Sequence, residues 1–446
     1  AATSVSDPSG LAAASRPNIV FILADDLGYG DLGCYGQRRI ATPNLDRMAA
    51  DGMRFTDAYG GSTVCAPSRC SFLTGLHTGH CRIRENRSIR GERVSLLPQD
   101  LTVAEVLSAA GYRTGAIGKW GVGEACTTGT PNKKGFNEWL GFLNQDHALA
   151  YYPTHLWRNE KEWFPKGNQG MKREDYVQDL FLKETLSFLG RNREHPFFLY
   201  LPYTLPHADS ERSRDTGDGY VVKNYGAYAQ RDWDSADRGY AACVSRLDAD
   251  VGRILQELRT LGLDERTLVL FASDNGPADE GRHKATFFQS AGKIRGVSLR
   301  GRKGDLYEGG IRVPAIARWP GVIAAGSTSS SPWAFMDLMP TFAELAGAPI
   351  PNGLDGVSIA PLLRGGTLPP GRVLYWEMPT EHSQQAVRAG QWKAVRAGKG
   401  TAPQLYHLPS DPGEQHDLAG SETDRLRELT QAMDRAHAES PDYQLR

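Results

Sequence analysis

The sequence predicts an α/β fold in which helices flank a large, mainly parallel central sheet. Short apolar runs rich in β-branched residues alternate with longer helix-like stretches, which is the pattern of strand–helix–strand units. Polar or ionisable residues follow four of these runs within a few positions. In open α/β sheets, ligands bind beyond the carboxyl ends of the strands, so this recurrence indicates a functional site at one edge of the sheet.

The central sheet is predicted from four apolar runs, each long enough for a buried strand. They are Asn18–Leu23, Thr114–Ile117, Phe197–Leu201 and Thr267–Phe271. The polar groups that follow them are Asp25-Asp26, Lys119, Pro206-His207 and Asp274-Asn275, in that order. Helices are expected between the strands, near 45–52, 100–111, 174–190 and 236–261.

The last hundred or so residues predict a smaller unit of a different kind. Segments rich in Gly, Pro and Ser at 321–326 and 349–356 indicate a change of unit. The short strands expected after them are Val373–Trp376, Gln385–Arg388, Trp392–Arg396 and Gln404–Leu408, with a final helix over 422–438. We therefore predict a flexible N-terminal tail (1–15), a main domain (16–350) and a C-terminal subdomain (351–446) of antiparallel sheet plus helix.

Composition excludes several classes of protein. With 51 basic and 52 acidic side chains among 446 residues, the formal net charge is -1, which gives no bulk attraction to nucleic acid or a membrane surface. No apolar run approaches the roughly 20 residues needed to span a bilayer. The Ala- and Ser-rich start, Ala1–Ser15, lacks the charged and apolar regions of a signal peptide and suits the start of a mature exported chain. Six cysteines without a CxxC pair argue against structural zinc and leave the compartment open.

Two acidic or amide pairs stand at the ends of predicted strands, and they indicate a metal site. Asp25, Asp26, Asp274 and Asn275 offer only oxygen ligands, which Ca²⁺ and Mg²⁺ prefer. Neighbouring parallel strands would bring both pairs to one edge of the sheet. Each pair taken alone fits a tight turn equally well.

The segment that begins at Cys65 resembles the signature of the type I sulfatases. In this signature a serine and an arginine follow the cysteine by three and four residues, and an apolar pair and Thr-Gly come next. The segment reads Cys65-Ala66-Pro67-Ser68-Arg69-Cys70-Ser71-Phe72-Leu73-Thr74-Gly75. Further matches are Gly118-Lys119-Trp120, Ser273-Asp274-Asn275-Gly276, Gly309-Gly310-Ile311-Arg312-Val313-Pro314 and Asp411-Pro412-Gly413-Glu414. The resemblance covers nearly the whole chain and implies an alkaline phosphatase/sulfatase-like fold, with a catalytic sulfatase domain at 16–350.

The resemblance implies that Cys65 does not remain a cysteine. In the family, a maturation enzyme converts it to formylglycine, whose hydrate attacks sulfur. A helix beginning near Pro67 would place Cys65 just before a helix N-terminus, which favours an anionic sulfate. The family also binds a divalent cation, for which the site suits Ca²⁺, with Mg²⁺ as the alternative. Its implied ligands are Asp25, Asp26, Cys65, Asp274 and Asn275.

The resemblance also implies roles for four further residues. Arg69 steadies the formylglycine hydrate, and Lys119 bridges the nucleophile and the sulfate. Lys303 contacts the sulfate and the leaving oxygen, and His207 donates a proton to the departing alcohol.

One position departs from the family pattern. Many members carry a histidine two residues after the first lysine, where this chain has Gly121. His147 is a candidate substitute, and a loop or substrate-pocket role for it is an equally good interpretation.

The function predicted from these features is hydrolysis of sulfate esters, releasing inorganic sulfate and an alcohol from a carbohydrate or aryl sulfate. The expected partners are a small sulfated substrate and the formylglycine-generating maturation enzyme, with no nucleic acid and no membrane span. The resemblance also implies export, to a periplasm or outside the cell. Two alternatives stay open. One is a phosphodiester or phosphonate monoester hydrolase on the same scaffold, and the other is a non-catalytic binder of sulfated glycans, motivated by Gly121.

Overall fold

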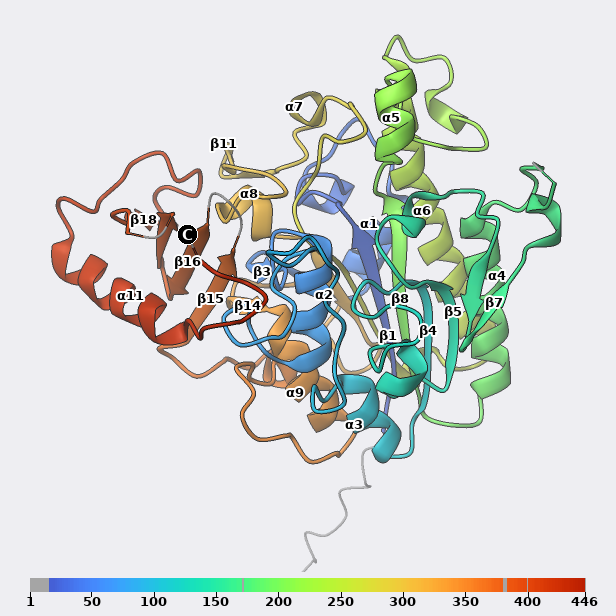
Figure 1. Cartoon of the computed structure of the whole chain (residues 1–446), viewed down its shortest axis with the longest axis horizontal. Helices are drawn as coiled ribbons and strands as arrows, with labels where there is room; N and C mark the ends of the chain where they lie inside the picture. The colour runs from blue at the N-terminus through green and yellow to red at the C-terminus, as the bar shows by residue number, and fades with distance from the viewer. Residues whose placement is uncertain (1–15, 171, 380–382, 399, 446) are drawn as a thin grey trace, which may run out of the picture.

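The computed structural model describes residues 16–445 apart from 171, 380–382 and 399, so the predicted tail at 1–15 lies outside the described residues. A ten-stranded sheet occupies the centre of the molecule, and a four-stranded sheet lies to its left in Figure 1. The strand order of the large sheet is β13-β2-β12-β9-β1-β8-β4-β5-β6-β7. No helix within the described residues is both long and apolar enough to cross a membrane.

The four strands predicted from the sequence lie side by side at the middle of this sheet. They are β9 (Thr267–Ser273), β1 (Asn18–Asp25), β8 (Phe197–Pro206) and β4 (Arg113–Lys119), all parallel, with β5 (Glu138–Phe142) parallel beyond β4. The remaining strands are β12 (Ala315–Arg318), β2 (Met53–Phe55), β13 (Ser327–Ser329), β6 (Leu156–Arg158) and β7 (Lys161–Trp163). Antiparallel pairing begins at β12 on one side and at β6 on the other. The mainly parallel α/β sheet is thus confirmed.

Strand β1 shows why its sequence is apolar without alternation. Val20 and Ile22 pack into the core on one face of the sheet, whereas Ile19 and Phe21 pack into the core on the other. The first face is covered by α1 (Pro43–Ala50), α4 (Val177–Asn192) and α6 (Ser235–Thr260). The second is covered by α2 (Cys65–Thr74), α3 (Val103–Ala109) and α9 (Leu338–Leu345). A parallel sheet buried on both faces requires such continuous apolar strands.

Short elements complete the main body and connect it to the smaller sheet. The helices are α5 (Ser210–Thr216), α7 (Ala285–Phe288), α8 (Glu308–Ile311) and α10 (Ala360–Leu363). The two-stranded pairs are β3 (Ala58–Tyr59) with β14 (Trp333–Ala334), and β10 (Lys293–Ile294) with β11 (Val297–Ser298).

The smaller sheet is antiparallel throughout, as predicted. Its strands are β15 (Val373–Met378), β16 (Gln384–Ala389), β17 (Trp392–Ala397) and β18 (Gln404–His407), in chain order. Helix α11 (Thr423–Ala436) packs against it through buried Leu429 and Met433. Leu429 and Met433 are four residues apart and therefore lie on the same face of α11, which is the face that packs against the sheet.

A buried ionic cluster ties the smaller sheet to the main body. Lys393 on β17 pairs with Glu308 Oε1 at 3.0 Å and with Glu414 Oε1 at 2.9 Å, and all three residues are fully buried. Burial opposes ionisation of Glu308, yet the positive charges of Lys393 and Arg312 hold its pKa at about 2.

We expect Lys393→Met to lower stability by roughly 3–5 kcal/mol, because it leaves two buried carboxyl groups without this cation. Thermal unfolding of the purified variant measures the effect. Lys161→Met on β7, where the side chain is exposed, is the matched control and should change stability by no more than about 0.5 kcal/mol. An unchanged unfolding temperature for Lys393→Met would show that the cluster does not stabilise the contact between the two sheets.

Candidate active site

The carboxyl ends of β1 and β9 bring the two predicted metal-ligand pairs together. Ala24 and Ser273 are register partners, so the residues that follow them are neighbours in space. The backbone N–H of Asp26 donates to Asp274 Oδ1 (3.1 Å), and Asn275 Nδ2 donates to Asp26 Oδ1 (2.8 Å). Asp26 itself has a φ of 66°, an uncommon left-handed conformation that typically occurs where surrounding structure enforces it.

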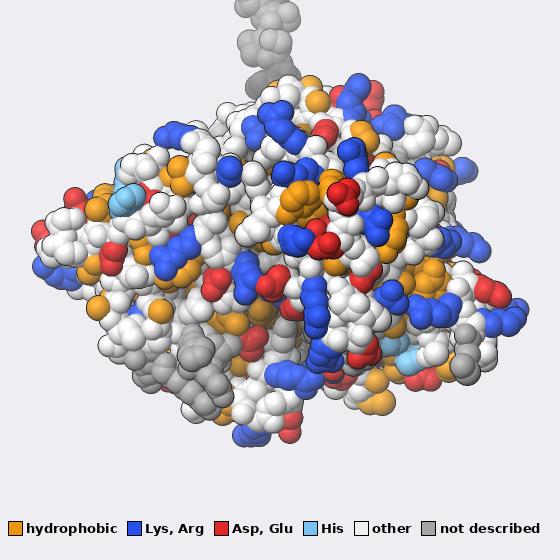
Figure 2. Space-filling view, turned by 90° about the horizontal axis from the view of Figure 1, so that it is seen from above, with side chains coloured by type: hydrophobic (Ala, Val, Ile, Leu, Met, Phe, Trp, Pro, Cys, Tyr) orange, Lys and Arg blue, Asp and Glu red, His pale blue; other side chains and the backbone are white. Residues whose placement is uncertain are grey.

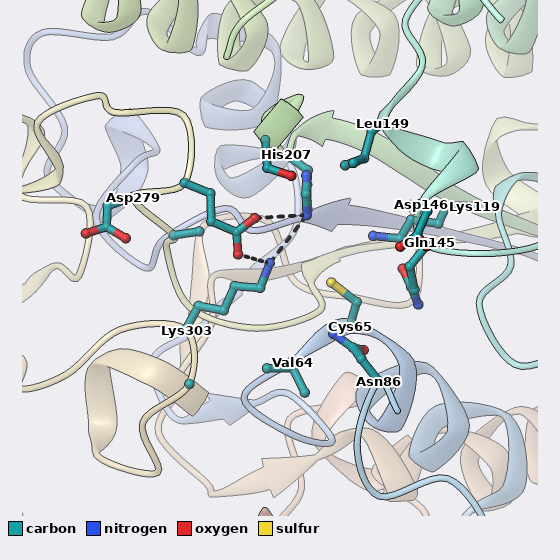
Figure 3. Close-up of a pocket in the computed structure, with 14 residues that line it drawn as sticks. Val64, Cys65, Asn86, Lys119, Gln145, Asp146, Leu149, His207, Asp279 and Lys303 are labelled. Carbon is teal, nitrogen blue, oxygen red and sulfur yellow. Dashed lines mark hydrogen bonds and ion pairs between the residues drawn. The ribbon is translucent and has the colours of Figure 1, made fainter. Parts of the chain in front are cut away.

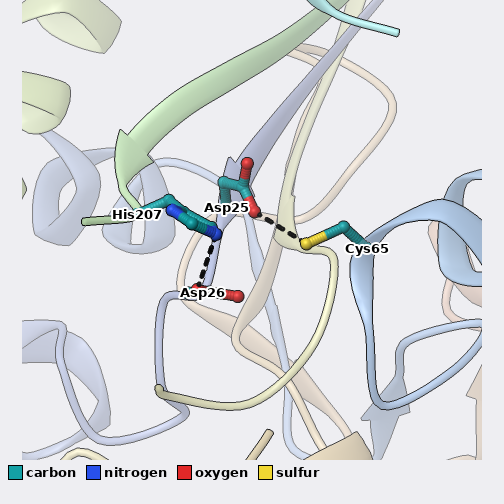
Figure 4. Close-up of side chains that lie close together, drawn as sticks. All are labelled: Asp25, Asp26, Cys65 and His207. Carbon is teal, nitrogen blue, oxygen red and sulfur yellow. Dashed lines mark hydrogen bonds and ion pairs between the residues drawn. The ribbon is translucent and has the colours of Figure 1, made fainter. Parts of the chain in front are cut away.

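This cluster fits a divalent cation. The Oδ1 atom of Asn275 is buried and accepts no hydrogen bond from any described residue. An unpaired buried acceptor costs about 1–3 kcal/mol, and a cation bound beside it would remove that cost. Ligand atoms of Asp25, Asp26, Cys65 and His207 also lie within 4.8 Å of one another (Figure 4). Most of the donors are oxygens, as Ca²⁺ and Mg²⁺ require.

The sequence predicts that Cys65 lies just before the helix. In the structure, Cys65 is instead the first residue of α2. The helix starts two residues before Pro67, and the N–H of Ser68 donates to the carbonyl of Val64 to close the first turn. Proline fits inside this first turn because its missing N–H would have no helical partner there. Asn86 Oδ1 accepts a hydrogen bond from the N–H of Ala66 (3.0 Å) and so caps the helix from a distant loop.

The thiol of Cys65 lies over the carboxylates and is almost fully buried, at 2 % exposure. Its Sγ donates to Asp25 Oδ1 at 3.3 Å. Burial, together with the negative charge of Asp25, raises the pKa of this thiol well above its usual range. An unmodified Cys65 is therefore protonated at neutral pH, and a protonated thiol is a poor nucleophile.

Each carboxylate of the cluster is paired with a buried cation. Lys119, the last residue of β4, places Nζ 2.6 Å from Asp25 Oδ2. Arg69, one turn into α2, donates to Asp274 Oδ2 at 2.9 Å. Although burial favours the neutral form of Asp25, the charges of Lys119, His207 and Arg69 hold its pKa far below the usual value. Burial and then the charge of Asp25 raise the pKa of Asp274 to about 7.

His207 and Lys303 form the opposite side of the site. Lys303 Nζ lies 2.9 Å from Asp26 Oδ2 and 3.3 Å from His207 Nε2. His207 Nδ1 lies 2.6 Å from the carbonyl of Ala208, which can only accept, so Nδ1 carries the proton in the neutral ring. Glu280 joins the pair, with Oε1 3.1 Å from Lys303 Nζ and Oε2 3.7 Å from His207 Nε2.

A cavity of about 310 Å³ opens above Cys65. Its lining combines the predicted residues Cys65, Lys119, His207 and Lys303 with Val64, Asn86, Gln145, Asp146, Leu149, Ser210, Ala278, Asp279, Glu280 and Gly304. Seen from above the molecule, Lys and Arg side chains lie interspersed with Asp and Glu (Figure 2). The volume and the convergent polar groups are those of a small-molecule site.

His147 lies between the lining residues Asp146 and Leu149 in the chain, but it is not among the described residues that line the cavity. Its ring packs against Phe142 and His155, with ring centroids 4.8 and 4.2 Å away. Burial, and then the neighbouring His155, lower its pKa to about 4.

The structure therefore brings Cys65, Arg69, Lys119, His207 and Lys303 to the carboxylate cluster and leaves His147 outside the lining. It also adds Asn86, Gln145 and Glu280, which no sequence motif had indicated. The proximity of Gln145 to His147 in the chain was the only available signal.

Comparison with known proteins places the chain in one family. The family model "Sulfatase" matches residues 17–348, and "N-sulphoglucosamine sulphohydrolase, C-terminal" matches residues 302–439. Arylsulfatase A of Homo sapiens is 36% identical over 95% of this chain and 88% of its own length. N-acetylgalactosamine-6-sulfatase of Canis lupus familiaris is 33% identical over 94% of this chain and 85% of its own length.

Solved structures agree with this placement. Ps i-CgsB, crystallised in complex with k-i-k-neocarrahexaose, has a TM-score of 0.81 and 30% identity over 96% of this chain and 94% of that chain. The phosphonate monoester hydrolase of Agrobacterium radiobacter, at 21% identity and a TM-score of 0.65, shares the fold alone. Since the sulfatase model covers most of the chain and these curated relatives align along nearly all of it, the protein belongs to the type I sulfatase family and is a sulfatase.

Proposed function

We propose that this sulfatase hydrolyses carbohydrate sulfate esters with a formylglycine made from Cys65 and a bound divalent cation, releasing inorganic sulfate and an alcohol. The observation that carries the proposal is the position of Cys65. It lies in the family signature at the start of a helix, beneath the cavity, with its Sγ 3.3 Å from Asp25 Oδ1. A thiol held protonated there has little use as a nucleophile, which supports its conversion.

In the matured protein, the hydrated aldehyde at position 65 supplies the hydroxyl nucleophile. Asp25, Asp26, Asp274, Asn275 and residue 65 would hold the cation, which supplies positive charge next to the sulfate. Lys119, which lines the cavity, and the buried Arg69 provide two further positive charges. Because these charges are already held in place by buried carboxylates, they can stabilise sulfuryl oxygens without reorganising.

His207 is placed to protonate the leaving alcohol. The bond between Nδ1 and the carbonyl of Ala208 orients the ring, so that Nε2 faces the cavity beside Lys303. In the protonated ring, Nε2 carries the hydrogen that passes to the leaving oxygen. Lys303 shares the negative charge that develops on that oxygen, and Glu280 lies within reach of both groups.

The mass of the tryptic peptide Phe55–Arg69, from protein made in its native host, tests the nucleophile directly. We expect a peptide in which an aldehyde replaces the thiol-bearing carbon of Cys65. The peptide from protein made in a host without the maturation enzyme is the control, and it should keep the cysteine. A cysteine that stays unmodified even after co-expression with that enzyme would contradict the proposal.

A carbohydrate sulfate is the substrate class that the relatives support. One curated relative is named for N-acetylgalactosamine 6-sulfate chemistry, and Ps i-CgsB was crystallised with an oligosaccharide. We expect small aryl sulfates to serve as artificial substrates. Turnover of an aryl sulfate, an aryl phosphodiester and an aryl phosphonate by the matured protein should favour the sulfate. A preference for either phosphorus ester would instead support the alternative hydrolase.

The cation and the location belong to the same proposal. We propose Ca²⁺, because the site offers several carboxylate and amide oxygens, and Mg²⁺ accepts such sites less readily. We also propose export, as the family resemblance implies. Fractionation of the native host, with detection of the protein outside the cytoplasm, is the measurement that checks the location.

A further inference from the structure

The side chain of Gln145 is a polar group of the cavity that makes no hydrogen bond within the described part of the chain. Gln145 follows β5 and lines the cavity together with Cys65 and Lys119. Its Nε2 and Oε1 are both buried, and neither makes a hydrogen bond with a described residue. Buried amide groups are nearly always hydrogen-bonded in folded proteins, so a carboxamide left unpaired in a cavity indicates a position where a ligand completes the bonding.

Gly121 and Gln145 occupy complementary space. A Cβ atom added to Gly121 would lie 2.3 Å from Gln145 Nε2 and 3.7 Å from Arg69 Cδ. Gly121 also has a φ of +85°, which side chains disfavour. The carboxamide of Gln145 therefore fills the volume that a side chain at position 121 would need, next to Arg69.

The loop that carries Gln145 is held on both sides by other residues. The N–H of Gly121 donates to the carbonyl of Leu143 (2.9 Å). Asn144 accepts from the N–H of His147 through Oδ1 (3.0 Å) and donates through Nδ2 to Glu124 Oε2 (3.1 Å). Neighbouring bonds thus fix the backbone of Gln145, and its own amide stays free for a ligand.

Figure 3 shows Gln145 on the same side of Cys65 as Lys119, opposite Asp279. A sulfate ester group has only acceptor oxygens, so the NH₂ of Gln145 can bind it and the carbonyl cannot. We propose that Gln145 is a sulfate-positioning residue, whose Nε2 donates to a sulfuryl oxygen from the space left open by Gly121. This inference rests on the proposed sulfatase function and assigns a donor that carries no charge and does not titrate near neutral pH.

The kinetic test compares Gln145→Ala and Gln145→Glu in the matured enzyme, with an aryl sulfate as substrate. We expect kcat/KM to fall roughly 10- to 100-fold in Gln145→Ala, the loss typical of one hydrogen bond to a charged group. Gln145→Glu should fall further, because a carboxylate of the same size offers no donor and repels sulfate. Gln256→Ala, at an exposed position of α6, is the control and should match the wild type.

This order of effects separates binding from packing. If Gln145 only filled space, the same-sized glutamate would be the milder change, and that result would overturn the inference. A second comparison uses Gly121→Ala, whose Cβ should displace the amide. Its loss of kcat/KM should not add to that of Gln145→Ala in the double variant, since both act on one contact. Additive losses would count against the shared contact.

Binding without turnover provides an independent readout. In a Cys65→Ala background with Ca²⁺ present, calorimetry should show that Gln145→Ala weakens inorganic sulfate binding about tenfold or more. Unchanged binding overturns the role of Gln145. If instead the matured wild type neither hydrolyses aryl sulfates nor binds sulfate, the proposed function fails before this residue is in question.

Discussion

Replacing Cys65 by alanine is expected to abolish sulfate ester hydrolysis while leaving the protein folded. Alanine lacks the thiol that the maturation enzyme acts on, so no aldehyde forms at position 65, and losses after removal of a covalent nucleophile reach roughly 10⁴- to 10⁶-fold. The fold should survive because Cys65 is small and its Sγ donates a single hydrogen bond to a described residue, Asp25. Release of the aryl alcohol from an aryl sulfate, followed with excess substrate, measures the loss.

Cys126→Ala is the matched control, since Cys126 is exposed and lies outside the cavity lining. It removes a thiol without touching the site and should keep wild-type turnover. Thermal unfolding of both variants shows whether each is folded. Robust turnover by Cys65→Ala would contradict the proposed mechanism, because no other described cysteine lines the cavity.

Removing divalent cations is expected to lower turnover by about 10³-fold or more, since a cation beside the reacting group contributes several kcal/mol of charge stabilisation. Dialysis against a chelator followed by addition of Ca²⁺ should restore activity. In Asn275→Ala, the buried unpartnered Oδ1 is gone, so the Ca²⁺ concentration for half-maximal activity should rise about tenfold or more. Activity measured against free Ca²⁺ gives both results.

Asn352→Ala, at an exposed loop position, should leave the Ca²⁺ dependence unchanged. The comparison matters because Lys119, Arg69 and Lys303 also pair with the carboxylates of the cluster. Full activity in chelator would mean that these three side chains alone neutralise the site. That outcome would refute a catalytic cation while leaving the fold and family unaffected.

The central strands and the small antiparallel sheet could be predicted because their signals are local. The residues of β1 are apolar without alternation, because the strand contributes to a core on each face of the sheet. The short strands β2 and β13 are not predicted from the sequence, since three-residue strands carry too little pattern. The sequence predicts a start of α2 near Pro67, two residues late, because proline is favoured at the first helical position but also fits further into the first turn.

By itself, the sequence determined the fold class, the nucleophile candidate and the two metal-ligand pairs. The apolar strands and the Cys65 segment are continuous in the sequence, and the two metal-ligand pairs directly follow strands β1 and β9. Only the tertiary structure decided that Asn86 caps α2, that Glu280 bridges Lys303 and His207, and that Gln145 fills the space above Gly121. These contacts join segments that are far apart in the chain. Their geometry is set by how the helices and the sheet pack together, which no local sequence pattern encodes.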